Sequence, residues 1–331
     1  MSNIFHDKEL SQLSFLVTGG AGFVGGHVAE YLLKNGAKKV RVLDNMSNGF
    51  KSNLEVLNQY AAFEFQEGDI RNLDECQRSC AGIDYVSHQA ALGSVPRSVR
   101  EPYYTNDVNV GGFVNILKAA VDNKVKQFIY ASSSSVYGDD PTLPKQEDRI
   151  GNCLSPYAVS KRANELYANV FANVYGISVI GLRYFNIFGP RQDPDGPYAA
   201  VIPLFVKGIL NKTPVFINGD GEQTRDFTFV ENAVQINIKA MLTEDTGAVN
   251  RVYNVAIGDN FSVNYLFSAI QKHLESDHKA TYRAPREGDI KHSLADISKA
   301  KELLKYQPTR KFEEGLVETI VYFRKLYEIE E

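Results

Sequence analysis

A glycine-rich turn near the start of the chain constrains the fold more than any other feature of the sequence. An apolar, β-branched run over residues 15–18 leads into Gly19, Gly22 and Gly25, and a helical pattern over about 23–35 follows. Glycines at such spacings let the backbone approach a pyrophosphate closely and let the helix pack against the strand. The pattern predicts a dinucleotide-binding strand–turn–helix unit, with a tight turn that binds no ligand as the alternative.

Apolar, β-branched runs alternate with helical patterns along the chain. Most of the apolar runs are apolar on both faces, which is typical of strands covered on both sides in a parallel sheet. We therefore predict an α/β fold, a doubly wound parallel Rossmann sheet of about seven strands with a smaller mixed C-terminal substrate domain. The expected strands are 15–18, 39–43, 63–66, 85–88, 127–131, 178–183 and 252–256, and the expected helices are about 23–35, 104–122, 157–174 and 231–243.

The alternation breaks after about residue 185. Residues 189–198 are rich in Pro, Gly and Asp and should be irregular, and further helical patterns lie near 263–275 and 313–329. No linker of disordered composition separates the two parts, so we expect two domains with a cleft between them. The predicted division is a nucleotide-binding domain over 1–185 plus about 222–256, and a substrate-binding domain over about 186–221 plus 257–331.

Charge and composition exclude several classes of protein. The 331 residues contain 36 Lys and Arg against 40 Asp and Glu, a net charge of −4. This mild acidity argues against nucleic-acid or membrane-surface partners, and no apolar run approaches the roughly 20 residues of a membrane span. With no signal-peptide pattern at the N-terminus, we expect a cytoplasmic protein. The three cysteines and six histidines show no ligand spacing, so we expect free thiols and no metal.

An acidic residue ends the predicted second strand. Asp44 lies 19 residues after Gly25, where a carboxylate would accept both adenosine ribose hydroxyls and repel a 2′-phosphate. This placement favours NAD over NADP, although Asp44 could instead be a turn residue before Asn45. Asp69 and Ile70 follow the third strand and would flank the adenine, Asp69 through a hydrogen bond and Ile70 through its backbone.

A tyrosine and a lysine form a candidate catalytic pair. Tyr157 and Lys161 are four residues apart on a predicted helix, so the phenol and the ammonium share a face. The ammonium and a cationic nicotinamide ring would each lower the pKa of the phenol, so that Tyr157 acts as a general base. Such spacing is common by chance, but Ser133 lies in a serine block 24 residues earlier, at the carboxyl end of a predicted strand. A serine there can share the reacting proton.

These motifs together resemble the extended short-chain dehydrogenase/reductase family, and within it the nucleotide-sugar epimerases. The most similar group is the bacterial UDP-N-acetylglucosamine 4-epimerases. The resemblance covers nearly the whole chain and is carried by TGGAGFVG, LDN, GDI, HQAA, ALGSVPRS, SSSVYG, SPYAVSK, RYFNIFGPRQDPDGPYAAVIP, INGDGEQTRDF, REGD and HSLADISKA.

The resemblance implies a role for each matching residue. Tyr157 would be the catalytic base, Lys161 would bind the nicotinamide ribose and Ser133 would hydrogen-bond the sugar 4-hydroxyl. The implied NAD-binding residues are Gly19, Gly22, Phe23, Val24, Gly25, Asp44, Asn45, Asp69, Ile70, Gln89, Ala90, Ala91, Asn109, Tyr157, Lys161 and Phe185. The implied UDP-sugar-binding residues are Gly93, Ser94, Ser133, Ser134, Asn186, Gln192, Ala200, Val201, Phe216, Asn218, Arg225, Arg286, Asp289 and Ser293.

Within the second set, the resemblance makes Arg225 and Arg286 a clamp for the diphosphate, which suits two bidentate guanidinium groups. Phe216 would stack on uracil, with Asn218 hydrogen-bonding nearby. Related dehydratases carry an Asp-Glu pair where this chain has Ser134 and Ser135, and related decarboxylases carry a glutamate in the same block. The resemblance therefore implies reversible epimerisation at carbon 4 with tightly held NAD and no net redox change.

The resemblance also assigns one position, Ser293, a part in determining which sugar the enzyme accepts. Ser293 matches the wall of the sugar pocket, where a small side chain leaves room for an N-acetyl group, as in UDP-GlcNAc and UDP-GalNAc. The residues expected to line the same side are Gly93, Ser94, Asn186, Gln192 and Ala200. Three alternatives stay open: a 4-epimerase of UDP-glucose and UDP-galactose, one of a UDP-hexuronate such as UDP-N-acetylglucosaminuronate, or a non-catalytic NAD- and UDP-sugar-binding protein.

The resemblance also implies a homodimer joined through a four-helix interface. The helices near 104–122 and 157–174 would form it, and a two-fold arrangement would bury the same patch on both chains. Their apolar residues include Val110, Phe113, Val114, Leu117, Leu166, Val170 and Phe171.

Overall fold

A seven-stranded parallel sheet forms the larger part of the molecule. The computed structural model describes residues 3–195, 199–285 and 291–328. The strand order is β3-β2-β1-β4-β5-β6-β11, with every neighbouring pair parallel. The strands are β1 Ser14–Thr18, β2 Lys39–Asp44, β3 Phe63–Glu67, β4 Tyr85–His88, β5 Gln127–Ser133, β6 Ser178–Tyr184 and β11 Arg251–Val255. The predicted fold class, a doubly wound parallel sheet, is confirmed.

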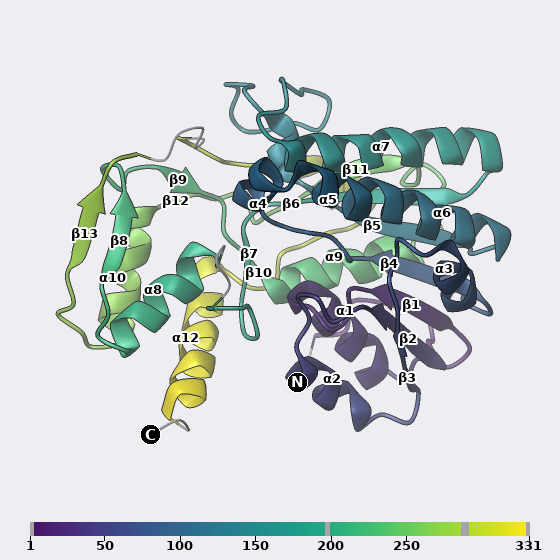
Figure 1. Ribbon diagram of the computed structural model, residues 1–331, viewed down its shortest axis with the longest axis horizontal. Coiled ribbons are helices and arrows are strands. Elements are labelled where there is room, and N and C mark those ends of the chain that lie inside the picture. Colours follow the sequence, from purple (N-terminus) through teal and green to yellow (C-terminus); the bar gives the residue numbers. More distant parts are fainter. Residues whose placement is uncertain (1–2, 196–198, 286–290, 329–331) are drawn as a thin grey trace.

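Two layers of helices cover the sheet, one on each face (Figure 1). Because neighbouring residues of a strand face opposite sides, Phe15 and Leu16 of β1 belong to different hydrophobic cores. The helices of one layer are α1 Phe23–Lys34, α2 Lys51–Asn58 and α9 Val230–Leu242. Those of the other are α3 Leu73–Cys80, α6 Gly112–Asp122 and α7 Pro156–Tyr175. Burial on both faces explains why the strands read as continuous apolar runs.

The helix expected over 104–122 is interrupted. It consists of α5 Pro102–Asn106, a π-helical turn Asp107–Gly111 and α6, and a short helix α4 Val95–Arg100 precedes it. The widened turn contains Asn109, whose side chain is buried and bonds the backbone of Leu92. A continuous apolar pattern does not reveal such a turn, because each residue keeps a nearly helical conformation.

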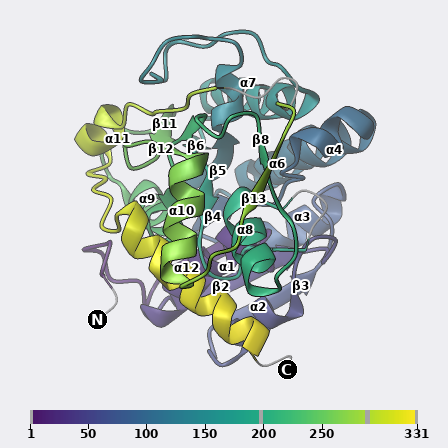
Figure 2. The same ribbon diagram turned by 90° about the vertical axis from the view of Figure 1, so that its left-hand side faces the viewer.

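A smaller lobe lies beside the large sheet (Figures 1 and 2). Its own hydrophobic core is built from α8, α10, α12 and the parallel pair β8–β13. Two short strand pairs lie at the junction, β7–β10 and β9–β12. The bounds are β7 Ile187–Phe188, α8 Val201–Leu210, β8 Val215–Asn218, β9 Thr224–Arg225, β10 Thr228–Phe229, β12 Phe261–Ser262, α10 Val263–His273, β13 Ala280–Arg283, α11 Ser298–Leu303 and α12 Phe312–Glu328.

The exact boundaries of the two predicted domains stay a prediction. The expected boundary near 222 falls just before β9, which pairs with β12 rather than with the large sheet. The chain therefore crosses between the two parts more than once around residues 185–260.

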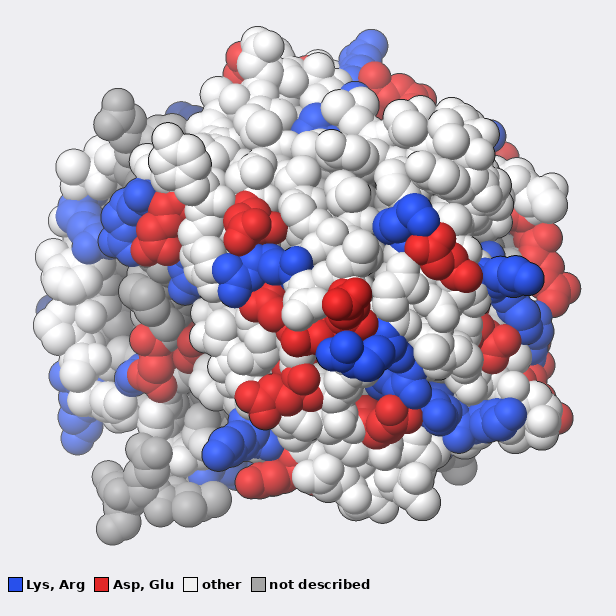
Figure 3. Space-filling view, turned by 45° about the vertical axis from the view of Figure 1, so that its right-hand side comes forward, with Lys and Arg blue, Asp and Glu red and all other residues white. Residues whose placement is uncertain are grey.

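Surface charges of both signs are interspersed on the face shown in Figure 3. Among residues 3–195, 199–285 and 291–328, no helix combines the length and apolar character that crossing a bilayer requires.

Candidate active site

A cavity of about 530 Å³ opens at the carboxyl ends of β1, β2, β4, β5 and β6. This is where ligands bind in open α/β sheets. It brings together most of the cofactor residues and four of the substrate residues expected from the sequence. The expected residues that line it are Gly19, Gly22, Phe23, Val24, Gly25, Asp44, Asn45, Ile70, Gln89, Ala90, Ala91, Gly93, Ser133, Ser134, Tyr157, Lys161 and Asn186.

The glycine turn forms one wall of the cavity. Gly19 has φ +70°, and a Cβ there would lie 2.7 Å from the Ala90 nitrogen. A Cβ at Gly25 would collide with the carbonyl oxygen of Gly19. Helix α1 begins after Gly22, which has no side chain to cap the helix start. The first residues of α1 line the cavity. The backbone thus offers close approach and helix-start N–H groups to an anion, which fits the pyrophosphate of NAD.

Asp44 lines the cavity beside the glycine turn, at the end of β2. Its Oδ2 accepts a hydrogen bond from the Ala21 nitrogen at 3.0 Å, and its Oδ1 accepts one from the Met46 nitrogen at 2.9 Å. Burial raises the pKa of this carboxyl, although the two backbone donors favour its ionised form. The donors also fix the carboxylate at the cavity edge, where it fits the adenosine ribose of NAD.

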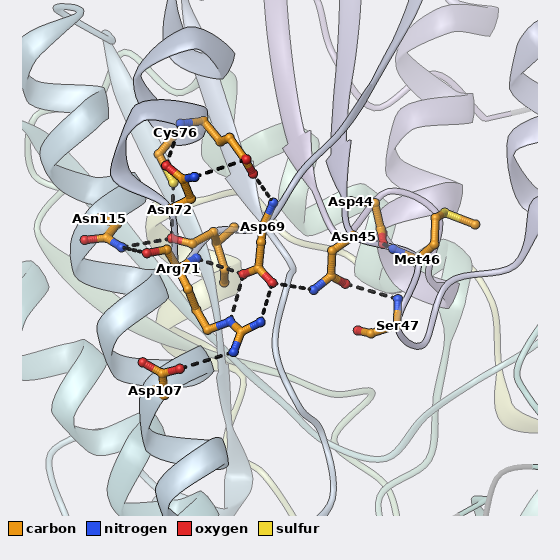
Figure 4. Close-up of polar contacts among 12 residues, drawn as sticks. Asp44, Asn45, Met46, Ser47, Asp69, Arg71, Asn72, Cys76, Asp107 and Asn115 are labelled. Atoms are coloured by element: carbon orange, nitrogen blue, oxygen red, sulfur yellow. Dashed lines mark hydrogen bonds and ion pairs between the residues drawn. The ribbon is translucent and has the colours of Figure 1, made fainter.

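Asp69 does not itself line the cavity, and Figure 4 shows its contacts with Arg71 and Asn45. Its carboxylate accepts hydrogen bonds from Arg71 Nη2 at 2.7 Å and from Asn45 Nδ2 at 2.9 Å. The Arg71 hydrogen bond holds the pKa of Asp69 at about 2. Its neighbours Gly68 and Ile70 line the cavity. In this structure Asp69 positions the cavity-lining Asn45, and its expected hydrogen bond to adenine stays a prediction.

Tyr157 and Lys161 lie on the first two turns of α7. The helix begins at Pro156, and Ser155 caps it by accepting a hydrogen bond from the Ala158 nitrogen at 3.1 Å. Lys161 Nζ donates to the carbonyl oxygen of Ala131 at 2.8 Å and lies 6.0 Å from the centre of the Tyr157 ring. Ser133 hydrogen-bonds with Tyr157 through its side chain. The three residues predicted to be catalytic therefore meet at one end of the cavity.

The pKa of Tyr157 in the protein alone is shifted in the direction opposite to the expected one. Burial raises the pKa of Tyr157, and only the Ser133 hydrogen bond opposes this rise. Burial also lowers the pKa of Lys161 to about 8, because desolvation disfavours the ammonium. The expected lowering of the tyrosine pKa is therefore absent from the protein alone, where desolvation dominates the shift.

A buried ion pair supports this end of the site and was not predicted. Glu165, one turn after Lys161, accepts hydrogen bonds from Arg183 at 2.8 and 2.9 Å and from Ser132 Oγ at 2.7 Å. Burial opposes ionisation of Glu165, but Arg183 lowers the pKa of Glu165 overall. Ser132 lines the cavity beside Ser133, so the ion pair fixes the end of β5 against α7.

Tyr184 is a second cavity residue that sequence reasoning missed. Its hydroxyl donates to Gln89 Oε1 at 3.0 Å and accepts from Asn237 Nδ2 at 2.7 Å. Its place at the carboxyl end of β6 was the available signal. The remaining unpredicted lining residues are Leu43, Ser47, Asn48, Gly49, Gly68, Ala131, Ser132 and Ile187.

Besides Asp69, two expected cofactor residues do not line the cavity. Phe185 is fully buried in the hydrophobic core. Asn109 accepts a hydrogen bond from the Leu92 nitrogen at 2.8 Å and donates to Ser160 Oγ at 3.1 Å. These contacts hold the segment after β4 against α7, so in this structure both residues support the cavity from behind.

Several expected substrate residues lie beyond the cavity. Arg225 Nη1 donates to the carbonyl oxygen of Thr224 at 2.9 Å, and Phe216 is 45% exposed with the Arg283 guanidinium over its ring. Ser293 is half-buried, and its nitrogen donates to the Thr224 carbonyl at 3.1 Å. The others outside the lining are Ser94, Gln192, Ala200, Val201 and Asn218. Arg286 and Asp289 lie outside the described residues.

The cysteines are free, and Cys76 and Cys80 are fully buried. Burial raises the pKa of Cys76 to about 12. In the described part of the chain, no three His, Cys, Asp or Glu side chains are grouped so that they could hold a metal ion.

Comparison with known proteins places the chain in a family. Residues 15–256 match the model of the NAD dependent epimerase/dehydratase family. The chain belongs to this family, as the resemblance to extended short-chain dehydrogenases/reductases predicted. The predicted cofactor, NAD, is confirmed at the level of the family.

Similar solved structures and relatives narrow the class. The structure resembles a UDP-N-acetylglucosamine 4-epimerase from Methanobrevibacter ruminantium M1 in complex with UDP-N-acetylmuramic acid, with 41% identity, a TM-score of 0.90 and coverage of 96% and 99% of the two chains. It also resembles a Thermotoga maritima UDP-glucose 4-epimerase with UDP-glucose, at 38% identity, a TM-score of 0.89 and 95% and 100% coverage. A UDP-glucuronate 4-epimerase of Thermodesulfobacterium geofontis is 34% identical, with 95% and 97% coverage. The chain is an NAD-dependent enzyme of the UDP-sugar 4-epimerase family.

Proposed function

We propose that this enzyme interconverts UDP-GlcNAc and UDP-GalNAc by inverting carbon 4. The observation that carries the proposal is the meeting of Ser133, Tyr157 and Lys161 in a cavity that the glycine turn also lines. A proton acceptor thereby faces the same space as the site that fits NAD. Similarity to the UDP-N-acetylglucosamine 4-epimerase at 41% identity supports the choice of substrate.

The residues of the chain suit a reversible proton transfer. Tyr157 takes the proton of the sugar 4-hydroxyl, and Ser133, hydrogen-bonded to Tyr157, orients that hydroxyl. Lys161 supplies a positive charge that favours the phenolate once it forms. When bound, NAD supplies the hydride chemistry at carbon 4. Tyr157 then returns its proton to the inverted oxygen, so the residues end the cycle as they began.

The nucleotide must stay anchored while the sugar turns. We assign the diphosphate to Arg225 and Arg286 and the uracil to Phe216, as the family resemblance implies. Phe216 is 45% exposed, so part of its ring stays accessible to a stacking partner beside the Arg283 guanidinium. The sugar needs looser contacts, because both faces of carbon 4 must reach Tyr157 in turn.

Ser293 supports an N-acetylated sugar because a small side chain leaves space at the sugar end. UDP-glucose, UDP-galactose and UDP-hexuronates are the competing substrates, since the relatives include epimerases of these kinds. Incubation with each UDP-sugar, followed by separation of the products, tests the proposal. Interconversion of UDP-GlcNAc and UDP-GalNAc supports it, and turnover restricted to plain or uronic sugars contradicts it.

We also propose a homodimer through α7 and its neighbours. Val159, Leu166, Val170 and Val174 are each more than half exposed, at spacings that place them on one side of α7. Of the predicted interface residues, Phe113, Leu117 and Phe171 instead belong to the core of the protomer. Light scattering at micromolar concentration should give twice the chain mass of 36.9 kDa, and a monomer mass would contradict the dimer.

A further inference from the structure

A buried carboxylate joins two segments beside the proposed substrate site. Asp226 lies between β9 and β10 and is 0% exposed. Its Oδ1 accepts a hydrogen bond from the Ile257 nitrogen at 3.1 Å, and its Oδ2 accepts from Gly258 at 3.1 Å and from Ala295 at 3.3 Å. One side chain therefore holds the turn after β11 and the segment before α11 in a fixed relation.

The second of these segments carries Ser293. Residues 291–296 form only isolated strand bridges, so their position depends on contacts with other parts of the chain. Backbone hydrogen bonds fix them on both sides of Ala295, from the Ser293 nitrogen to the Thr224 carbonyl oxygen at 3.1 Å and from the Asp296 nitrogen to the Lys145 carbonyl oxygen at 2.9 Å. The carboxylate of Asp226 adds the side-chain anchor between these two contacts.

The backbone of Asp226 contacts a residue that lines the cavity. Its carbonyl oxygen accepts a hydrogen bond from Asn186 Nδ2 at 3.0 Å, and Asn186 lines the cavity with φ +36°. A positive φ is unfavourable for a residue other than glycine, so contacts must hold it in place. Asp226 thus lies next to Arg225, one hydrogen bond from Asn186 and one hydrogen bond from the segment that carries Ser293.

A carboxylate is an expensive group to bury for structural purposes alone. The pKa of Asp226 is raised to about 7, chiefly by burial and to a lesser extent by the nearby Asp259, against the opposing effect of the three amide donors. The neighbouring phenol of Tyr306 stays neutral, since burial raises the pKa of Tyr306 well above its ordinary value. Near neutral pH, Asp226 can therefore gain or lose a proton. Both carboxyl oxygens accept hydrogen bonds from the backbone when the proton is absent, and one of them becomes a donor when it is present.

We propose that Asp226 is a positioning residue for sugar recognition, whose carboxylate sets where Ser293 stands and so how wide the sugar end of the site is. This inference rests on the proposed function, because it assumes that the sugar lies beside Ser293. Asp226 touches neither the sugar nor the cofactor site; it acts through the backbone of residues 293–295.

Asp226→Asn tests the inference with nearly unchanged volume. The amide replaces one acceptor oxygen with a donor, so at least one backbone N–H loses its partner. We expect the KM for UDP-GlcNAc to rise about 10-fold or more, with kcat changed less than about threefold and the NAD content unchanged. Asp259→Asn is the matched control, because it removes a neighbouring charge from an exposed position, and its KM should stay within about twofold.

Binding measurements separate this inference from the proposed function. In titration calorimetry, Asp226→Asn should weaken UDP-GlcNAc more than UDP, because only the former presents a sugar to the Ser293 segment. Equal weakening of both ligands, or of neither, would overturn the positioning role. A wild-type enzyme that binds UDP but fails to epimerise UDP-GlcNAc would instead overturn the proposed function.

Wild-type protein gives an independent test if Asp226→Asn does not fold. A protonated carboxyl has one oxygen that donates, so the segment should loosen as the pH falls below about 7. Amide hydrogen exchange at Gly258 and Ala295, corrected for the intrinsic rate, should be less protected at pH 6 than at pH 8. Equal protection at the two pH values would show that the carboxylate does not hold the segment.

Discussion

Lys161 donates a hydrogen bond from Nζ to the carbonyl oxygen of Ala131, 2.8 Å away, and so joins α7 to the end of β5. Ser133 follows Ala131 by two residues, so the side chains of Ala131 and Ser133 lie on the same face of β5. The lysine therefore helps to set the distance between Ser133 and Tyr157. A single buried contact links the three residues assigned to the chemistry.

Replacement of Tyr157 by phenylalanine tests the assignment of the base. Tyr157→Phe keeps the ring but loses the hydroxyl, so turnover should fall by at least about 10²-fold, the lower range for general-base catalysis. NAD content and UDP binding should persist. Tyr175→Phe, at the half-exposed end of the same helix, is the control and should stay near wild type. Steady-state kinetics of the two variants decide the matter, and near-normal turnover by Tyr157→Phe would refute the assignment.

The lowered pKa of Lys161 predicts a pH-dependent stability. Between pH 8 and about 10.5 the unfolded chain binds the lysine proton while the folded chain has released it. Stability of the cofactor-free protein should therefore gain up to about 1.4 kcal/mol per pH unit from this residue as the pH rises. Lys161→Met should remove that gain.

Urea denaturation of both proteins at pH 8.0 and pH 9.5 measures the difference. Only the change between wild type and Lys161→Met counts, because other groups titrate equally in both. The same pH dependence in the two proteins would show that the ammonium is not desolvated.

Two arginines pair with the carboxylate of Glu165, one buried and one exposed. Replacing each in turn compares how much a buried and an exposed ion pair contribute to the free energy of unfolding. Arg183 is 1% exposed and Arg162 is 38% exposed, and both contact Glu165. Arg183→Met should lower the free energy of unfolding by about 3–5 kcal/mol, because Glu165 is left buried without its main partner. Arg162→Met should cost at most about 1 kcal/mol. Denaturation curves that show equal losses would contradict this account of the ion pair.

The sheet could be predicted because its signal is local. Apolar runs such as residues 127–131 are covered on both faces, and the observed β5 extends this one by only two residues. The glycine turn and Asp44 could likewise be found from spacing, and the Tyr157–Lys161 pair from its spacing together with the serine block that contains Ser133. Each depends on one strand end or one helix face.

Other features depend on contacts between distant segments. Glu165 and Arg183 meet across 18 residues and Asp226 meets Ala295 across 69, so no periodicity in the sequence reveals either contact. Phe185 and Asn109 were expected to bind NAD but lie behind the cavity, because their burial depends on how distant segments pack around the large sheet. The electrostatics of Tyr157 were predicted from its charged neighbour, whereas desolvation, a property of the whole fold, proved larger.

A bulky side chain at the proposed sugar wall tests substrate size. Ser293→Tyr should fill the volume that an N-acetyl group needs, at a cost of roughly 1–3 kcal/mol, or about 10–100-fold in kcat/KM. UDP-GlcNAc and UDP-GalNAc should lose this factor, and UDP-glucose and UDP-galactose should not. Ser293→Ala is the control that keeps the pocket open. Equal losses for both pairs of substrates would show that Ser293 is not the wall.

The interconversion of UDP-GlcNAc and UDP-GalNAc by the purified enzyme tests the central claim most directly. Started from either sugar, the reaction should reach the same product ratio, without added cofactor and without net accumulation of NADH, since Tyr157 and Ser133 serve both directions. Denatured protein should release NAD(H) rather than NADP(H), as Asp44 requires. Failure to convert either N-acetylated sugar, while UDP-glucose or a UDP-hexuronate is epimerised, would contradict the proposed function.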